Sequence, residues 1–347
     1  MVAPPPGSSD AGPIHASALP GGPLGDRACE SGEDSVINAS SAEPSALADT
    51  ATSSSLLADL LELTKPRIVM MILITAVVAA LLAAGPAVSL GMLLHLMIGV
   101  ALVAGSAGAM NQVWEYRVDA LMDRTRRRPI PAGRLGLLLS ISFSLAIGVL
   151  GTAYLVFAFG PIPAWVAVAT WLVYVPIYTP LKVRSEWNTT VGALSGALPI
   201  MIGYTAAGGS LTDVSGWLLV GVLFAWQYPH FMAIAWLCRR QYGEAGFQMT
   251  TTLEPTGRRA GWQSVAGMAM LTVCLLALAV ILTPQSWLAT AVLAAGLLLA
   301  TYPMTAAAVR FALRRDDLTA RRLLRASLLQ LPGSLVLLTL AALFFGS

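Results

Sequence analysis

The sequence VSLGMLLHLMIGVALVAGSAGAM, residues 88–110, runs directly into NQVWEYRVDALMDRTRRRPIPAGR, residues 111–134. The first stretch contains no charged residue, and about 20 such apolar residues are enough for a helix that crosses a bilayer core. The second stretch contains three carboxylates and six arginines. The sequence therefore predicts a membrane span whose end carries a dense group of ionisable side chains.

The composition extends this prediction to the whole chain. Of its 347 residues, 56% are hydrophobic and 11% are charged, and the mean hydropathy is +0.72. Soluble domains carry about 25% charged residues. Nine apolar runs are long enough to be spans, at about 67–84, 88–112, 136–158, 161–179, 190–207, 215–237, 264–283, 286–310 and 322–346. The predicted fold class is an all-α polytopic membrane protein with nine transmembrane helices.

The basic residues fall in alternate loops of this arrangement. Lys and Arg precede the first span and follow the second, fourth, sixth and eighth, whereas the loops after spans one, three, five and seven contain none. Basic loops stay in the cytoplasm, so we expect the N-terminus there and the C-terminus in the periplasm. Because topology accounts for these residues, the net charge of +3 gives no reason to expect a nucleic-acid partner.

Residues 1–55 have a different composition from the rest of the chain. They are rich in Pro, Gly, Ala and Ser and show no apolar periodicity, which predicts a disordered tail ahead of a membrane domain at residues 56–347. Arg27 is the one basic residue in this tail, against seven acids. Mitochondrial transit peptides are rich in Arg and poor in acids, so we expect a bacterial inner membrane.

Four polar residues of the charged segment are spaced four apart: Asn111, Glu115, Asp119 and Asp123. On a helix these positions share one face. Amide and carboxylate oxygens are ligands of the kind that bind Mg²⁺, and the guanidinium groups of Arg124 and Arg128 match phosphate oxygens. Three interpretations stay open at this point: charge neutralisation at the membrane surface, an ion or proton path, and a Mg²⁺-dependent diphosphate site.

Two further segments carry polar groups. YTPLKVRSEWNTTVG, residues 178–192, follows the fourth span and supplies Lys182 and Arg184. FAWQYPHFMAIAW, residues 224–236, lies inside the sixth span, where Pro229 predicts a helix break beside Trp226 and His230. A lone histidine in a span more often packs through a hydrogen bond than binds a ligand, and we expect this structural role for His95.

These segments together resemble the UbiA superfamily of intramembrane prenyltransferases, and within it the branch that farnesylates heme. The similarity rests on NQVWEYRVDALMDRTRRRPIPAG, on YTPLKVRSEWNTTVGALSGALPIMIGY, and on WQYPHFMAIAW with YGEAGFQM. It extends from about Thr64 to the C-terminus. One position departs from the pattern: Gln241 stands where the heme branch usually has an acid, so a second Mg²⁺ would be held by a neutral oxygen there or by Glu244.

The resemblance implies nine helices around a cavity that opens to the cytoplasm and sideways to lipid. It also implies transfer of the farnesyl group of farnesyl diphosphate to a vinyl group of heme B, with addition of water on the porphyrin side, giving heme O and diphosphate. Expected partners are therefore farnesyl diphosphate, heme B and the lipid bilayer, with contacts to heme A synthase or to oxidase assembly factors.

The same resemblance assigns roles to individual residues. Mg²⁺ would be held by Asn111, Glu115 and Asp119, which with Lys182 form the catalytic set. The diphosphate would contact Arg124, Arg128, Lys182 and Arg184. The acceptor would contact His230, Trp226 and Tyr178. Aromatic side chains near the site would face the allylic cation; the candidates are Trp114, Tyr116, Tyr174, Tyr178 and Trp226.

Two other functions compete with this one. A prenyltransferase of the same superfamily could use another acceptor, such as a quinone precursor, although WQYPHF favours heme. A transporter could use the acidic face as a cation path, but the charges lie at one edge of the membrane, and Asp213 is the one charged residue in the predicted outer loops.

Overall fold

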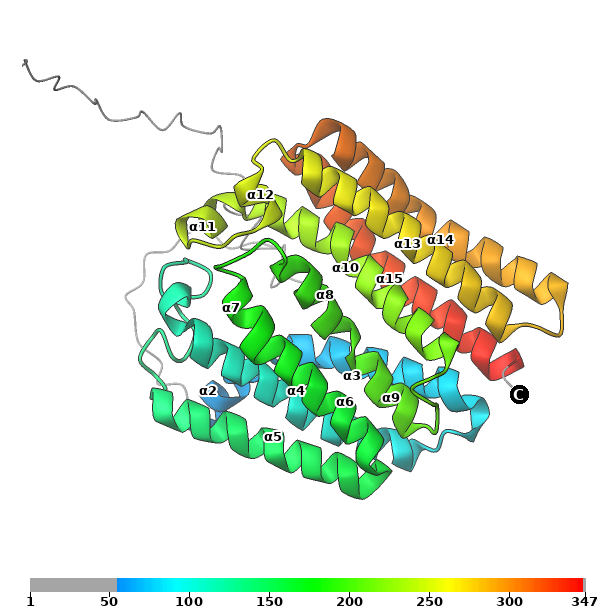
Figure 1. Ribbon diagram of the computed structural model, residues 1–347, viewed down its shortest axis with the longest axis horizontal. Helices are drawn as coiled ribbons and strands as arrows, with labels where there is room; N and C mark the ends of the chain where they lie inside the picture. The colour runs from blue at the N-terminus through cyan, green and yellow to red at the C-terminus, as the bar shows by residue number, and fades with distance from the viewer. Residues whose placement is uncertain (1–54, 346–347) are drawn as a thin grey trace, which may run out of the picture.

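The computed structural model describes residues 55–345, and within that range every regular element is a helix (Figure 1). The predicted tail, residues 1–55, lies outside the described residues except for Ser55. The helices are α2 (Leu56–Leu63), α3 (Pro66–Ala84), α4 (Leu90–Asp119), α5 (Leu137–Phe159), α6 (Pro161–Leu172), α7 (Thr179–Leu181), α8 (Asn188–Ala197), α9 (Pro199–Ala206), α10 (Val214–Leu237), α11 (Arg239–Glu244), α12 (Thr250–Leu253), α13 (Arg258–Leu282), α14 (Trp287–Arg314) and α15 (Asp317–Phe345), with a 3-10 turn η1 (Gly85–Ala87) and a π-helical turn η2 (Val173–Tyr178).

Eight helical segments of the described chain are long and apolar enough to cross a membrane. The predicted fifth span, 190–207, is different because it consists of two short helices, α8 and α9, that follow one another along the bundle (Figure 1). Pro199 begins α9, and a proline has no backbone N–H to continue the hydrogen-bond ladder of α8. The all-α prediction is confirmed, and the count of nine is approximate because one crossing is broken.

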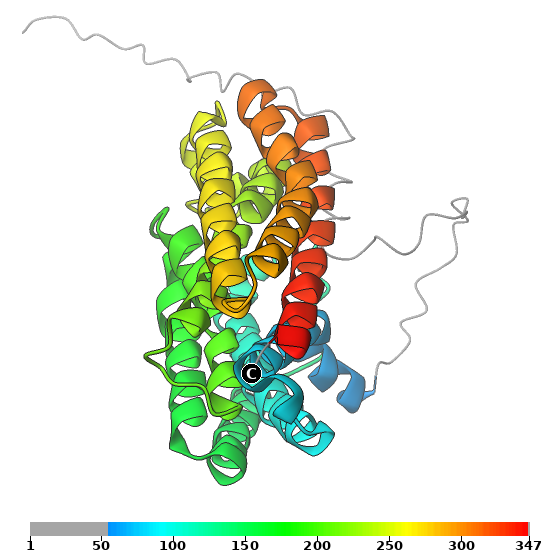
Figure 2. The ribbon, with the colours of Figure 1, turned by 90° about the vertical axis from the view of Figure 1, so that its right-hand side faces the viewer.

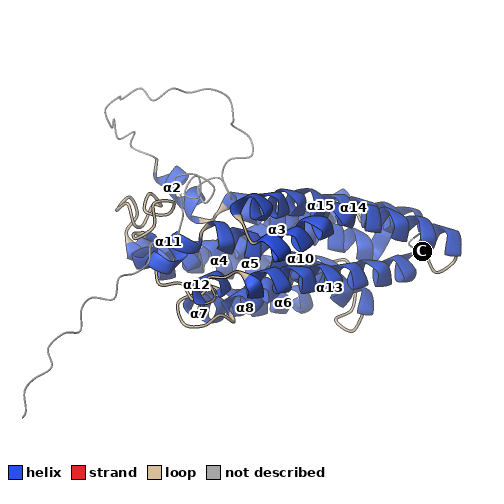
Figure 3. Ribbon diagram, turned by 90° about the horizontal axis from the view of Figure 1, so that it is seen from above, coloured by secondary structure: helices blue, strands red, loops and turns tan. Residues whose placement is uncertain are grey.

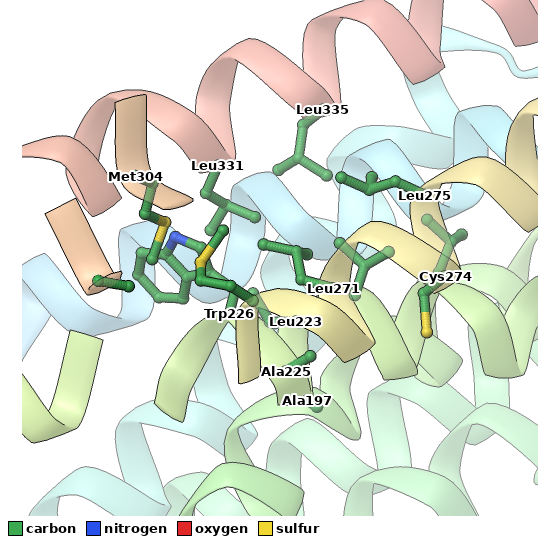
Figure 4. Close-up of a cluster of buried hydrophobic side chains, with 14 of the residues drawn as sticks. Ala197, Leu223, Ala225, Trp226, Leu271, Cys274, Leu275, Met304, Leu331 and Leu335 are labelled. Atoms are coloured by element: carbon green, nitrogen blue, oxygen red, sulfur yellow. The ribbon is translucent and has the colours of Figure 1, made fainter. Parts of the chain in front are cut away.

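The longest helices pack in two groups. Helices α3, α4, α5, α6 and α9 contact one another, and α10 packs with α13 and α15, which also contact α14. Figure 2 shows α13, α14 and α15, drawn yellow to red, on one side of the bundle. The largest buried apolar cluster lies in this second group and includes Leu271, Leu275, Met304 and Leu331 (Figure 4).

Close backbone contacts hold helices of the first group together, as is usual where lipid gives no hydrophobic drive for helix association. Gly203 of α9 packs against α3 so tightly that a Cβ atom there would lie 1.9 Å from the carbonyl oxygen of Ala76. The broken crossing is therefore fixed against the first span at a position where no larger residue fits.

Two prolines inside the spans lie in different backbone surroundings. Pro176 lies within the π-helical turn η2, where the extra residue per turn accommodates its ring and its missing N–H. The predicted helix break at Pro229 is wrong, because α10 continues from Val214 to Leu237. Pro229 leaves the carbonyl oxygen of Ala225 without its helical N–H donor. Gly267 of α13 packs closely against this carbonyl group, since a Cβ atom at Gly267 would lie 2.9 Å from its oxygen.

Four of the short helices gather at one end of the bundle. α2, α7, α11 and α12 lie together there, whereas α15 ends at the opposite end (Figures 1 and 3). Glu115, Asp119, Arg128 and Lys182 belong to segments that reach the same end as these short helices. The fold thus brings the two charged segments of the sequence, residues 111–134 and 178–192, to one end of the bundle.

Candidate active site

The last two turns of α4 form the floor of the site. Asn111, Glu115 and Asp119 share one buried face, as their spacing predicts, with exposed fractions of 0%, 7% and 1%. Asp123 is not part of this face because α4 ends at Asp119. The chain turns there, and the Thr125 hydroxyl donates to the carbonyl oxygen of Asp119 at 2.8 Å. Asp123 is exposed and pairs with Arg126 at 3.3 Å, so the prediction of a four-residue face is wrong for its last member.

Glu115 forms a buried ion pair with Lys182. Lys182 Nζ lies 2.8 Å from Glu115 Oε1, and the two side chains are 14% and 8% exposed. The ammonium group also lies 4.8 Å from the centre of the Tyr178 ring. Burial alone would lower the pKa of Lys182, but the Glu115 carboxylate and the neighbouring Tyr178 and Tyr174 raise it above its usual value. Lys182 is therefore a fixed positive charge.

Asp119 forms the second ion pair of the site. Arg128 Nη1 lies 2.8 Å from Asp119 Oδ2, with the arginine side chain 21% exposed and the carboxylate 1% exposed. Of the other predicted diphosphate ligands, Arg124 is partly buried and Arg184 is exposed at the bundle surface. The structure thus joins Arg128 and Lys182 to the α4 face and leaves Arg184 exposed.

Lys65 is a member of the site that the sequence analysis missed. Its ammonium group donates to Asn111 Oδ1, and Asn111 Nδ2 donates to the Thr179 hydroxyl at 3.0 Å. That hydroxyl in turn donates to the carbonyl oxygen of Tyr174 at 3.0 Å, across the π-helical turn. Burial and the nearby charge of Arg128 lower the pKa of Lys65 to about 7. Lys65 and Lys182 are the two lysines of the chain. This scarcity of lysine is the feature of the sequence that could have identified Lys65 as a candidate site residue.

A strained turn brings Lys65 to this position. Its φ angle is 56°, in the left-handed region that a residue other than glycine rarely adopts. The turn fits because α4 has Gly108 opposite it: a Cβ atom there would lie 2.9 Å from the carbonyl oxygen of Thr64. Gln112 of α4 also donates to the carbonyl oxygen of Leu63 at 3.0 Å. Strain of this kind persists where surrounding contacts impose it.

The loop after the fourth span is tied to the segment after the sixth. The Gln248 N–H donates to the carbonyl oxygen of Lys182 at 2.8 Å. Asn188 Nδ2 donates to the carbonyl oxygens of Ser185 at 2.7 Å and of Gln248 at 2.8 Å. Glu244 is the residue expected to hold a second Mg²⁺ if Gln241 does not. Its side chain is 63% exposed and pairs with Arg240 at 3.1 Å. The YGEAGFQM segment therefore supports Lys182 through backbone contacts.

The predicted acceptor residues fall in two places. Tyr178 belongs to the Lys182 cluster. Trp226 is 8% exposed and lies in the apolar cluster near Met304 and Leu331 (Figure 4), where its indole N–H donates to the carbonyl oxygen of Ser327 on α15 at 3.0 Å. His230 stacks on Trp226 with ring centres 4.6 Å apart, and its Nδ1 lies 2.8 Å from Ser327 Oγ.

The neighbouring residues of α10 turn to a different helix. Gln227 Nε2 donates to the carbonyl oxygen of Ala193 at 2.9 Å, and the Tyr228 hydroxyl donates to Thr190 Oγ1 at 2.9 Å. Both partners lie on α8. Trp226 and His230 are thus held against α15 and not in the cluster around Lys182, and their acceptor role stays a prediction. His95 has the structural contact expected for it, 2.6 Å from Nδ1 to the Tyr154 hydroxyl.

The residues of the α4 face suit a divalent cation that is shared with an anion. Within residues 55–345, no group of three His, Cys, Asp or Glu side chains is arranged to hold a metal ion by itself. The face offers two carboxylates and one amide, surrounded by Lys65, Lys182 and Arg128. Mg²⁺ binds through one or two carboxylates and completes its shell with water and substrate phosphates. The mixture of acidic and basic side chains therefore suits Mg²⁺ bound together with a phosphate group. It would not suit Mg²⁺ bound by protein side chains alone.

Sequence comparisons agree with this arrangement. The UbiA prenyltransferase family matches residues 72–329. A protein of Rhodopirellula baltica named protoheme IX farnesyltransferase is 54% identical over 286 residues, which are 82% of this chain and 99% of that protein. A protein of Solibacter usitatus with the same name is 36% identical over 284 residues, covering 79% of this chain and 95% of that protein.

A solved structure shares the fold. It is a UbiA homolog from Archaeoglobus fulgidus bound to GPP and Mg²⁺, with a TM-score of 0.58 over 81% of this chain and 99% of that chain. The two sequences are 15% identical, so this likeness concerns the arrangement of the helices.

Proposed function

This chain is a multi-pass membrane protein that belongs to the UbiA prenyltransferase family. On that premise we propose that it transfers the farnesyl group of farnesyl diphosphate to a vinyl group of protoheme IX. The products are heme O and diphosphate. The observation that carries this proposal is the buried face of α4, where Asn111, Glu115 and Asp119 meet the basic side chains of Lys65, Lys182 and Arg128. The names of the relatives support heme as the acceptor.

The ion pairs of the site can exchange partners when the substrate binds. In the structure, Lys182 and Arg128 neutralise Glu115 and Asp119. On arrival of the diphosphate, Lys182, Arg128 and Lys65 would turn to its oxygens, and Glu115, Asp119 and Asn111 would then be available to hold Mg²⁺. When bound, Mg²⁺ supplies charge neutralisation to the leaving diphosphate. Once the ion pairs have exchanged partners, the charged groups would already surround the diphosphate, so little further reorganisation would be needed as the C–O bond breaks.

The position of the site at the edge of the bundle suits a substrate that is both charged and apolar. Lys65 precedes the first residue of the span that begins at Pro66, and Lys182 follows the span that ends at Leu181. The diphosphate would lie at this boundary, and the farnesyl chain would extend into the hydrocarbon. The rings of Tyr174 and Tyr178, with centres 5.4 Å apart, would face the allylic cation and exclude water, which would otherwise convert it to farnesol.

An assay with purified protein tests this proposal and separates the two acceptors. Protein in lipid nanodiscs would receive farnesyl diphosphate and Mg²⁺ with heme B, or with an aromatic quinone precursor in place of heme. We expect diphosphate release that depends on heme B and stops when EDTA removes Mg²⁺. Release with the quinone precursor and none with heme B would establish the alternative acceptor, and substrate-independent ion flux without diphosphate release would establish a transporter.

Gly108→Val is expected to raise the KM for farnesyl diphosphate by about 10-fold or more, because small displacements of a binding group have effects of this size. The added side chain would push the Thr64 turn, and with it Lys65, away from Asn111. Initial rates at a series of substrate concentrations measure the effect. Gly136→Val is the matched control, since a Cβ atom at Gly136 meets nothing within 4 Å; an equal KM in both variants would contradict this role of the turn.

We also propose a bacterial inner-membrane location with the site in the cytoplasm. Reporters fused after Arg128 and after Arg259 are expected to give cytoplasmic signals, and a reporter fused after Ser347 a periplasmic signal, because basic loops are retained on the cytoplasmic side. Alkaline phosphatase and green fluorescent protein fusions measure the two sides. A periplasmic signal after Arg128 would place the site on the wrong side for this proposal.

A further inference from the structure

The Thr179 hydroxyl can only accept a hydrogen bond from Asn111. Thr179 is 2% exposed, and its hydroxyl donates to the carbonyl oxygen of Tyr174 at 3.0 Å. A hydroxyl group has one hydrogen to donate and lone pairs with which it accepts. Asn111 Nδ2 donates to the hydroxyl oxygen at 3.0 Å. The contact therefore determines which end of the Asn111 amide faces Thr179, and that end is the nitrogen.

The other end of the same amide faces the charged side chains. Asn111 is 0% exposed, and its Oδ1 atom accepts from the amino group of Lys65. The carboxylates of Glu115 and Asp119 lie close enough to Lys65 to act on it electrostatically. With the amide reversed, its N–H₂ group would face the donating group of Lys65, and its oxygen would face the lone pairs of Thr179. The observed orientation satisfies both neighbours.

The π-helical turn η2 commits the proton of the Thr179 hydroxyl to its own segment. In a regular α-helix, the carbonyl oxygen of Tyr174 would accept from the N–H four residues later. Here it accepts from the N–H of Thr179, five residues later, and from the Thr179 hydroxyl as well. Such π-helical turns occur frequently at functional sites. The irregular backbone thus leaves the hydroxyl oxygen as an acceptor for α4.

The segment after this turn meets α4 at two points. Thr179 and Lys182 are three residues apart, so they lie on the same side of their segment. Thr179 contacts Asn111, and Lys182 Nζ lies 2.8 Å from Glu115 Oε1. The second contact is an ion pair, for which an anionic substrate competes. The first contact joins two uncharged groups, so the arrival of an anion gives it no reason to break.

We propose that Thr179 is a positioning residue of the metal site, whose hydroxyl keeps Asn111 Oδ1 directed at the charged face, where this oxygen would be a ligand of Mg²⁺. This inference rests on the proposed function. Mg²⁺ takes oxygen ligands, whereas the amide N–H₂ group is a hydrogen-bond donor, so a reversed Asn111 could not serve. Residues that orient a metal ligand commonly change metal affinity by about 10-fold to 100-fold.

The test is the binding of Mn²⁺, which suits the same oxygen ligands as Mg²⁺ and is observed by electron paramagnetic resonance. Full-length protein in lipid nanodiscs would contain S-farnesyl thiodiphosphate, an analogue with sulfur as the bridging atom, at one concentration for all variants. Thr179→Val has nearly the same shape without the hydroxyl, and it should raise the Kd for Mn²⁺ by about 10-fold or more. Thr179→Ser keeps the hydroxyl and should restore the wild-type Kd.

A second background tests the orientation of the amide itself. The two oxygens of a carboxylate are equivalent acceptors, so in Asn111→Asp no orientation remains for Thr179 to select. Thr179→Val should therefore add little to the Kd for Mn²⁺ in that background. An equal rise in both backgrounds would show that Thr179 acts only through the packing of its segment on α4, and would overturn the inference.

The control is Thr170→Val, because the Thr170 hydroxyl donates to the carbonyl oxygen of Val166 on its own helix at 2.8 Å. It should leave the Kd for Mn²⁺ unchanged. A wild-type Kd in Thr179→Val would overturn the inference, whether or not thermal stability falls. If Thr179→Val does not fold, Thr179→Ala also lacks the hydroxyl and is judged by the same outcomes. Failure of the wild type to bind Mn²⁺ together with the analogue would instead refute the proposed function.

Discussion

Asp119→Asn is expected to lower the rate of farnesyl transfer by about 100-fold or more, the scale of losing a charged ligand of a catalytic metal. The asparagine is nearly the same size, so the bundle should keep its fold, and the carboxylate that would bind Mg²⁺ is removed. Asp119 is 1% exposed and pairs with Arg128, so no other acid of the segment can replace it. Diphosphate release by purified protein, measured over a range of Mg²⁺ concentrations, reports the loss.

Asp123→Asn is the matched control for this variant. Asp123 has the same side chain, lies four residues away, and pairs with Arg126 at the surface with 66% of its side chain exposed. Its rate should stay within about twofold of the wild type, because exposed ion pairs contribute little. Equal rates in Asp119→Asn and Asp123→Asn would mean that the acids only neutralise the basic loop.

Lys182→Met is expected to cost about 100-fold in turnover and to lower thermal stability, whereas Arg184→Met should have little effect on either. Removal of Lys182 leaves Glu115 buried without its partner, and breaking such a pair costs about 3–5 kcal/mol. The two variants differ because Lys182 Nζ lies 2.8 Å from Glu115 Oε1, whereas Arg184 is exposed.

A double variant separates stability from activity. Glu115→Gln together with Lys182→Met removes both charges, so thermal unfolding should return towards the wild-type temperature while turnover stays low. Unfolding followed by circular dichroism and turnover by diphosphate release give the two readings. Recovery of turnover in the double variant would show that the pair is structural and that the diphosphate is bound elsewhere.

Local periodicity correctly predicted that Asn111, Glu115 and Asp119 share one face of α4. Asn111, Glu115 and Asp119 are related by helical spacing alone, so their common face follows from the sequence. The end of the helix does not follow in this way, because it depends on the hydrogen bond from Thr125 to the Asp119 carbonyl. That is why Asp123 was misplaced.

Contacts between distant segments were harder to predict. Lys65 is separated from Asn111 by 46 residues, and it reaches the site only because a left-handed turn fits against Gly108. The direction of His230 is set in the same way, by Ser327, which lies 97 residues further along the chain. No pattern within the α10 sequence says which side of the helix meets α15.

The prolines give a second example of this limit. Each lacks a backbone N–H, yet Pro199 separates two helices, Pro176 lies in a π-helical turn and Pro229 lies in a continuous helix. The outcome at Pro229 depends on Gly267 of a neighbouring helix, which closes over the freed carbonyl group. The sequence therefore identifies positions where the backbone is perturbed, and the packing decides the form of the perturbation.

The most direct measurement is the mass of the heme extracted from membranes of a bacterial host that cannot farnesylate heme itself. With the wild-type chain, heme O should appear beside heme B; with Asp119→Asn expressed to the same level, heme B alone should be present. Heme B alone in membranes that contain the folded wild-type protein, together with a prenylated form of a different ring compound, would contradict farnesyl transfer to heme.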